Sequence, residues 1–507
     1  MAGGSDGSGA SAEAHPVAGP RPRSRVIRRP SLFTIVFTLS VVVFLAVRLG
    51  PSLVGARVFA GLDVFDLFPP WSHLPGAADP VETSIYVTDQ IDSNFPAMNE
   101  VRERLLRGDL AWWSSMVAGG RALLGTINLG LISPGRIFFL LLPTYLAPAW
   151  SKLFEIGFAG AFTYLLVRRL GGSRAAGAVA GFVYPMTGFI IGWTTWTQTA
   201  VASIIPMIFW AIERFLALGR VRDVVPVSIA TALLVFGGFP AVAGQTLYLA
   251  AGYAVVRAVT LHWGQVRRVV SSLAVLGGGV ALGFALSAVQ LFPFAAQTLG
   301  DVDLSYRQDR FFDQVPLQYL LTSIFPESFA GNRLAAPASP MDLNSYVGGV
   351  VVILAVLGLL QLRRLGRARS AVVYLALVVV FVIGLVWFQG AWSAWLGELP
   401  VFSGNPIGRI RSQLGLPAAV LAGLGVDWIM CNGRRAADVG RAPRRLEPWV
   451  GAGLAALVTG LAAVAAGILL SGRILGTSQN VTSDVITTLV PMVLVTLVLF
   501  WQAGARA

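Results

Sequence analysis

The sequence predicts an all-α integral membrane protein, a polytopic bundle of about twelve transmembrane helices. Three observations lead to this fold class. Only 12% of the residues are charged and the mean hydropathy is +0.70, whereas about 25% of the residues in a typical soluble domain are charged. Apolar runs of about twenty residues, the length that crosses a bilayer as a helix, recur along the whole chain. Backbone amides in lipid must be satisfied within their own segment, so these runs indicate helices rather than strands.

Residues 1–30 are rich in Gly, Ala, Ser and Pro and end in a cluster of arginines. This composition is typical of a disordered segment, and we expect it to lie in the cytoplasm. The apolar run that follows lacks a small-residue cleavage site. We therefore expect it to be retained as the first helix of a transmembrane domain that covers 31–505.

The other helices are predicted from the apolar runs in chain order. The expected spans are approximately 31–49, 148–167, 175–193, 201–218, 224–240, 241–259, 268–293, 345–362, 370–390, 410–430, 448–471 and 485–503. The arginine-rich loops between these spans all fall on one side, as the positive-inside rule requires of cytoplasmic loops. The pattern predicts a plasma-membrane protein with both termini in the cytoplasm.

Two long segments then face away from the cytoplasm, at 50–147 and 294–344. The first outer loop is expected to be structured, because NEVRERLLRGD, residues 99–109, has the pattern of a short amphipathic helix that ends at Gly108. The pattern places Val101, Leu105 and Leu106 on one side of that helix. RIFFLLLPTYLA, interrupted by Pro143, is too short to cross the bilayer and is predicted to be interfacial or re-entrant.

The net charge of +13 does not indicate nucleic-acid binding. The arginines lie in short loops between apolar runs, and no basic stripe is interleaved with aromatic residues. An anionic lipid surface is the partner that this distribution favours. Cys431 is the only cysteine and the three histidines lie far apart, so no cysteine or histidine metal site is expected.

Five passages, taken in order, cover most of 60–427. They are DQIDSNFPAMNEVRERLLRGDLAWW, GGRALLGTINLGLISPGRIFFLLLP, LSAVQLFPFAAQTLGDVDLSYRQ, SYVGGVVVILAVLGLL and LPVFSGNPIGRIRSQLGLPAAVLAGLGVD. Together they resemble the YfhO-like bacterial membrane proteins, within the GT-C class of polytopic glycosyltransferases. Two positions depart from the family pattern. The family's Trp-Asn-Pro is Trp113-Ser114-Ser115 here, and its Pro-Leu-Leu is Ala122-Leu123-Leu124 after Arg121.

The resemblance implies a membrane glycosyltransferase that moves a sugar from a polyprenyl-phosphate carrier to an acceptor of the cell envelope, outside the cytoplasm. The acceptor hydroxyl loses a proton as it attacks the anomeric carbon, so the reaction needs a carboxylate as general base. The departing phosphate gains negative charge, which guanidinium groups or a metal ion stabilise. The donor sugar and the acceptor cannot be predicted from these residues.

Asp89 occupies the aspartate position of the first family passage, so the resemblance implies that it is the base. Asp92 then holds the acceptor or shares a divalent cation, Mg or Mn, with Asp89. The ordinary alternative is that both aspartates stabilise a turn. The candidate substrate-binding residues are Arg409, Arg411, Arg307, Arg310, Arg121 and Trp113. For Arg409 and Arg411, contact with lipid headgroups is the alternative to carrier binding.

Two other classes of protein stay open. The altered family passages are compatible with a non-catalytic envelope-assembly protein that keeps the architecture. A transporter or flippase for a lipid-linked glycan needs ionisable groups near the middle of the membrane. The predicted spans have almost no acidic residues at their centres, and Glu155 and Glu213 lie towards span ends.

Overall fold

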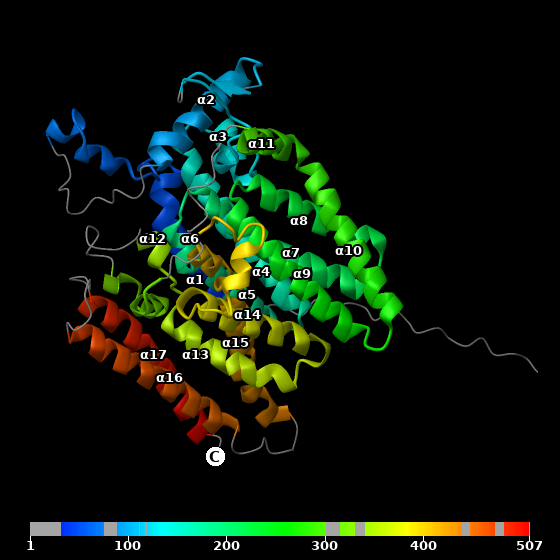
Figure 1. Ribbon diagram of the computed structural model, residues 1–507. Coiled ribbons are helices and arrows are strands. Elements are labelled where there is room, and N and C mark those ends of the chain that lie inside the picture. Colours follow the sequence, from blue (N-terminus) through cyan, green and yellow to red (C-terminus); the bar gives the residue numbers. More distant parts are fainter. Residues whose placement is uncertain are drawn as a thin grey trace, which may run out of the picture.

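The computed structural model is almost entirely helical (Figure 1). The structure describes residues 32–75, 89–110, 112–116, 119–300, 315–329, 340–438, 447–471 and 481–505. Within these ranges the only sheet is a hairpin of two short strands, β1 Trp113–Ser114 and β2 Arg121–Ala122. The expected N-terminal segment 1–30 and parts of both outer loops lie outside the described residues.

Among the described residues, seven helical segments are long and apolar enough to cross a membrane. They are Leu32–Leu53 (α1), Thr197–Leu218 (α7), Val266–Leu286 (α10), Gly366–Trp387 (ending in α14, Arg369–Trp387), Ile407–Met430 (continuing into α15, Gly415–Asp438), Pro448–Leu470 (in α16, Glu447–Leu470) and Val481–Gly504 (α17). The fold is thus that of an all-α, multi-pass membrane protein. This part of the prediction is confirmed.

The remaining expected spans are also helical, but they are shorter or more polar. They contain α4 (Ala147–Arg169), α5 (Arg174–Val183), α6 (Gly188–Gly192), α8 (Val225–Phe236), α9 (Pro240–Leu261) and α13 (Gly349–Leu359). The expected span 175–193 is interrupted at η7, Tyr184–Met186, where Pro185 lacks the amide that a continuous helix needs.

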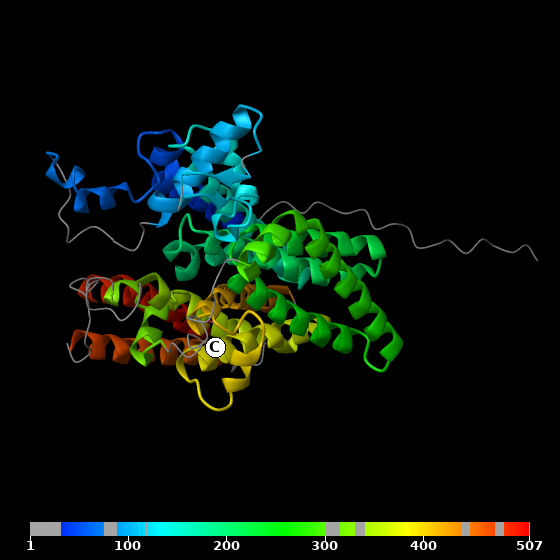
Figure 2. The same cartoon turned by 45° about the horizontal axis from the view of Figure 1, so that its top comes forward.

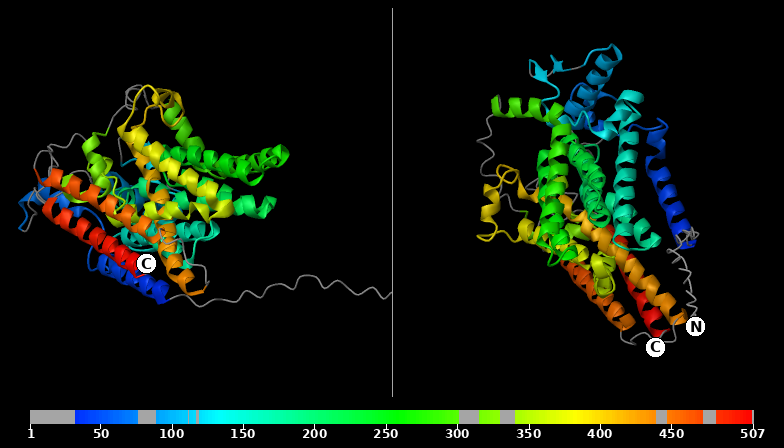
Figure 3. Two further views of the ribbon diagram at one scale, coloured as in Figure 1. Left: turned by 90° about the horizontal axis from the view of Figure 1, so that it is seen from below. Right: turned by 90° about the vertical axis from the view of Figure 1, so that its right-hand side faces the viewer.

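The expected span 268–293 is likewise not one helix. It ends as α10 at Leu286, and α11, Ala288–Gly300, turns away from it near the end of the molecule where α2, Phe95–Leu106, lies (Figure 1; Figure 3, right). The hydroxyl of Ser287 donates to the carbonyl oxygens of Gly283 and Phe284, at 3.1 and 3.0 Å. Such back-bonding competes with the backbone ladder and bends helices.

The helices form a packed centre and a lipid-exposed periphery. In α7 and in Ile407–Met430, 78% of the apolar window is buried, against 6% in α1 and 28% in α16 and α17. Small residues let the central helices approach closely. A Cβ at Gly425 of α15 would lie 1.9 Å from the Leu354 carbonyl oxygen of α13. The exposed apolar faces of α1, α16 and α17 are those that lipid covers.

The chain turns gather at two ends of the bundle. At one end α2, Phe95–Leu106, and the β1–β2 hairpin stand above the helices (Figure 2), whereas the C-terminal end of α17 lies at the opposite end (Figure 3, right). At this second end Ser173 N donates to Asp427 Oδ2 at 2.7 Å, and Arg257 Nη1 donates to the Arg367 carbonyl at 2.7 Å.

The short helix predicted within 99–109 is confirmed, although it begins four residues earlier. It spans Phe95–Leu106 and is followed by Gly108 in a left-handed conformation, φ +80°. Its buried residues are Ala97, Met98 and Val101, but Leu106 is 68% exposed. The apolar residues that the pattern places on one side of this helix therefore differ in burial, because only the first half of α2 rests on the segment 123–147.

Candidate functional site

The candidate acidic residues lie on one turn before α2. Gln90–Asn94 forms a π-helix, η4, that begins directly after Asp89 and runs into α2. Single π-helical turns are frequent at functional sites. The side chains of Asp89 and Asp92 are exposed, whereas those of Gln90 and Asn94 in the same turn are buried. Partial burial, and to a lesser extent the neighbouring charge of Asp92, raise the pKa of Asp89 above its ordinary value.

Helix α2 is fixed on the segment that follows it in the chain. The rings of Phe95 and Phe139 pack with centroids 5.9 Å apart, and Thr144 Oγ1 donates to Asn99 Oδ1 at 2.9 Å. Phe139 belongs to α3, Ile137–Leu141, which at five residues is far too short to cross a bilayer, as predicted.

A buried cluster of charges lies beneath this acidic turn. Lys152, the only lysine of the chain, is 2% exposed, and its Nζ lies 3.8 Å from Glu155 Oε2. Thr199 Oγ1 donates to the same carboxylate oxygen at 3.0 Å. Arg136, 5% exposed, stacks its guanidinium on Phe139 at 5.4 Å and also lies within the electrostatic reach of Glu155. Two cations therefore share one carboxylate.

The acidic turn and the buried cluster are linked through α6 and the turn after it. Lys152 Nζ donates to the Ile190 carbonyl at 2.9 Å, and Gln90 Nε2 donates to the Thr194 carbonyl at 2.7 Å. The two carbonyls are four residues apart, about one helical turn. The acidic turn at Asp89 and the positive cluster are thus neighbours at the same end of the bundle.

A narrow crevice borders this cluster. It lies between the segment at Ser133–Gly135, α4 and α7, and Glu155 and Ser203 are among the groups that line it. None of the space between these groups is wide enough for a water molecule.

Arg409 and Arg411 lie at the same end of the bundle but in a different setting. Arg411 is buried and donates from Nε to the Gly408 carbonyl at 2.7 Å and from Nη1 to Ser345 Oγ at 3.3 Å. Arg409 stacks on Phe239 at 5.1 Å and lies 3.9 Å from Asp342. No hydrogen bond or ion pair joins Asp89 to either arginine, all three of which the structure describes.

Trp113 and Arg121 lie on the hairpin next to α2. Ser114 pairs with Arg121 across the strands, and Trp113 with Ala122. The Trp113 indole, 54% exposed, lies against Gly120, where a Cβ would be only 2.5 Å from the ring. Helix α2 holds this strand because Arg104 donates to the Trp113 carbonyl and Ser114 Oγ donates to Glu100 Oε2 at 2.5 Å. Burial lowers the pKa of Arg121 from its ordinary value.

The remaining predicted site residues and ligands stay predictions. Arg307 and Arg310 lie outside the described residues. In the described part of the chain no group of three His, Cys, Asp or Glu side chains could hold a metal ion. Asp89 and Asp92 offer two carboxylates, and Mg²⁺ is often held by one or two carboxylates together with substrate phosphates. The predicted divalent cation thus depends on oxygens that a substrate supplies.

Arg136 and Lys152 were not among the sequence-based candidates. A signal for them is present in the sequence, because Lys152 is the single lysine and lies in a predicted span, and an ionisable residue inside a span indicates function. Its partner Arg136 follows Ser-Pro-Gly, where the sequence suggests only a turn. No model of a known protein family matches the chain, and neither does any curated protein.

Proposed function

We propose that this protein is a GT-C-type glycosyltransferase of the YfhO-like family. It spans the plasma membrane about twelve times and has both termini in the cytoplasm. The Asp89 end of the bundle then faces outward. The observation that carries the proposal is the proximity of the acidic turn to the buried Arg136–Lys152–Glu155 cluster, joined through the carbonyls of Ile190 and Thr194.

The two halves of the site match the two charge requirements of sugar transfer from a polyprenyl phosphate. Asp89 takes the proton of the acceptor hydroxyl as the new bond to the anomeric carbon forms. The bond between that carbon and the carrier phosphate breaks, and its electron pair stays on the phosphate. Arg136 and Lys152 exceed the charge of Glu155 by one positive unit and stabilise this phosphate. The raised pKa of Asp89 brings the base closer to neutral pH, where proton transfer is more efficient.

The remaining candidates take supporting roles in this proposal. Trp113 offers an exposed ring face to a sugar, and Arg121, half-buried beside it, binds an anionic group of the donor or acceptor. Arg409 and Arg411 line the path of the carrier at the same end. The partners are a polyprenyl-phosphate sugar, an envelope glycan or lipid acceptor, and the bilayer itself.

The test uses full-length protein in vesicles, supplied with a panel of polyprenyl-phosphate monosaccharides and envelope extracts as acceptor. Asp89→Asn is expected to abolish transfer while membrane insertion and thermal stability are retained. Glu103→Gln, which changes an exposed acid of the same loop, serves as the matched control and keeps transfer. Full turnover by the Asp89→Asn variant would refute the assignment of the base.

One observation favours a second candidate function, a transporter or flippase of a lipid-linked glycan. The buried Lys152–Glu155 pair is the kind of ionisable pair that transport pathways contain inside the membrane. An experiment distinguishes the two functions. A flippase moves the lipid-linked glycan across the vesicle membrane in the absence of an acceptor, and the Asp89→Asn variant still does so. Such movement would support the second candidate.

A further inference from the structure

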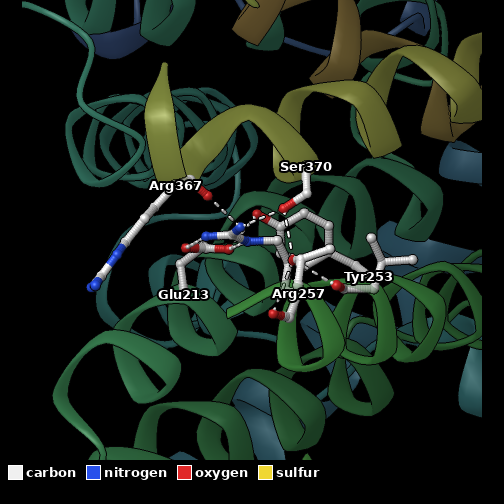
Figure 4. Close-up of polar contacts among 7 residues, drawn as sticks. Glu213, Tyr253, Arg257, Arg367 and Ser370 are labelled. Carbon is white, nitrogen blue, oxygen red and sulfur yellow. Dashed lines mark hydrogen bonds and ion pairs between the residues drawn. The ribbon is translucent and has the colours of Figure 1, made fainter. Parts of the chain in front are cut away.

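A second polar cluster lies at the opposite end of the bundle, and it is completely paired (Figure 4). Arg257 of α9 binds Glu213 of α7 through Nε at 2.5 Å and Nη2 at 3.0 Å. Its Nη1 donates to the Arg367 carbonyl and to Ser370 Oγ, both at 2.7 Å. Tyr253 donates its hydroxyl to Glu213 at 2.8 Å. This network fixes the ends of α7, α9 and α14 against one another.

Next to this network lies a cavity of about 450 Å³. It is lined by Thr260, Leu261, Gly366, Arg367, Arg369, Ser370 and Val373. Its walls are joined, because Thr260 Oγ1 and Ser370 Oγ are hydrogen-bonded at 2.8 Å. A volume of 450 Å³ equals about fifteen water molecules in the liquid, which leaves room for a hydrated polar group.

The charge of this cavity is positive and uncompensated. Arg367 and Arg369 are exposed, and neither lies within 4.0 Å of a carboxylate in the described part of the chain. Glu213 does not neutralise these two arginines, because Arg257 already bonds to both of its carboxylate oxygens and Tyr253 bonds to one of them. In Figure 4 the Arg367 side chain points away from the Arg257 guanidinium while its carbonyl faces it.

The cavity lies at the depth of lipid headgroups. Gly366 and Arg367 begin the segment Gly366–Trp387, which is long and apolar enough to span a membrane, so its first residues lie near a membrane surface. Trp263, two residues after the C-terminal residue of α9, is 80% exposed, and exposed indoles at helix ends favour this interface. Leu261 and Val373 give the cavity apolar walls beside its two arginines.

We propose that this cavity binds the phosphodiester headgroup of an anionic phospholipid, with Arg367 and Arg369 on the phosphate and the Thr260–Ser370 hydroxyl pair on the headgroup alcohol. Basic pockets between the ends of transmembrane helices recognise such headgroups. The bound lipid bridges α9 and α14, the two helices that Arg257 already joins. This site is independent of the transfer reaction proposed for the other end.

The test is a titration of full-length, detergent-solubilised protein with phosphatidylglycerol, followed by native mass spectrometry. Arg367→Gln/Arg369→Gln is expected to weaken binding about 25-fold, about fivefold for each arginine removed. The matched control is Arg220→Gln/Arg222→Gln, which removes the same charge from exposed positions at the turn between α7 and α8. It keeps the affinity of the unmodified protein. Thermal unfolding checks that both variants are folded.

Three results would overturn the proposal. The first is equal weakening by both double variants, which indicates general charge attraction. The second is equal binding of phosphatidylcholine, which shows no preference for an anionic lipid. The third is equally tight binding of soluble glycerol phosphate, which assigns the cavity to a free phosphate compound instead of a lipid.

Discussion

At the scale of single residues, Asp89 and Asp92 place two carboxylates on one turn, and their repulsion contributes to the raised pKa of Asp89. Asp92→Asn removes that contribution, so we expect the pKa of Asp89 to fall. If Asp89 is the base, the acid limb of the profile of rate against pH then moves to lower pH. The profile of donor consumption by full-length protein in vesicles measures this change.

The raised pKa of Asp89 also predicts how the stability of the folded protein changes with pH. Because the folded-state pKa of Asp89 is raised, its ionised form is less favourable in the folded protein than in the unfolded chain. Stability is lost as the pH rises from the ordinary carboxyl pKa through the raised one. Asp89→Asn therefore leaves the protein at least as stable at neutral pH.

The rate profile of Asp92→Asn tests the assignment of Asp89 as the base, with Glu103→Gln as control. An acid limb that stays at the same pH in Asp92→Asn would contradict that assignment.

The buried cluster allows a sharper test at the same scale. Glu155→Gln leaves Lys152 and Arg136 buried without a counter-charge, which is expected to cost about 3 kcal/mol of unfolding free energy. Replacing all three charged residues, Arg136→Met/Lys152→Met/Glu155→Leu, removes the buried charges and is expected to restore most of that stability, because apolar replacements of buried ion pairs and triads are often neutral. Unfolding in detergent measures both variants. A triple variant less stable than Glu155→Gln would show that the charged cluster itself stabilises the fold.

Prediction from the sequence succeeds and fails at identifiable residues. Asp89 and Arg409 could be selected because they stand in recognisable passages, but their partners could not. Lys152 lies 62 positions after Gln90 in a sequence of ordinary apolar residues, and only the fold brings both side chains to neighbouring carbonyls of one segment. Residue identity predicts which groups can react. Distances between them depend on long-range packing that no local pattern contains.

At the scale of elements, the bilayer makes helix positions predictable, because a fixed apolar thickness demands a fixed number of residues. Breaks within helices are less predictable. Hydropathy continues through Ser287 and through Tyr184–Met186, yet side-chain bonds to the backbone and a proline end the helices there. The same limit applies to α2, whose apolar pattern puts Val101 and Leu106 on one side although only the first half of the helix has a surface beneath it.

The close contact between α13 and α15 can be tested by a substitution at Gly425. Gly425→Ala places a methyl group against the Leu354 carbonyl, where an ideal Cβ would lie 1.9 Å from the oxygen, and α13 and α15 must move apart. We expect a loss of about 1–3 kcal/mol of unfolding free energy. Gly460→Ala in α16 is the control, because nothing lies within 4 Å of its Cβ position. Equal stability of the two variants in a thermal unfolding assay would show that this close approach is not required.

At the scale of the whole molecule, the arginines of the turns gather at one end of the bundle. The turns between α4 and α5, α7 and α8, α9 and α10, and before α14 contribute Arg168, Arg169, Arg174, Arg220, Arg222, Arg267, Arg268, Arg363, Arg364, Arg367 and Arg369. Contacts such as Arg257 with Glu213 and with Ser370 join these helix ends in space. The candidate site lies at the other end, the end at which α2 stands (Figure 2). Acidic and basic residues are mixed there.

This asymmetry predicts the orientation in the membrane, because loops rich in arginine are retained in the cytoplasm. Cys431→Ser supplies a cysteine-free background, in which Met116→Cys marks the α2 end and Gln265→Cys marks the turn before α10; both positions are exposed. In intact cells a membrane-impermeant maleimide is expected to label Met116→Cys and not Gln265→Cys, whereas permeabilised cells label both. The reverse pattern would place Asp89 in the cytoplasm. A sugar transferase acting on the outer surface would then be impossible, and the basic cavity near Arg367 would face the outer leaflet.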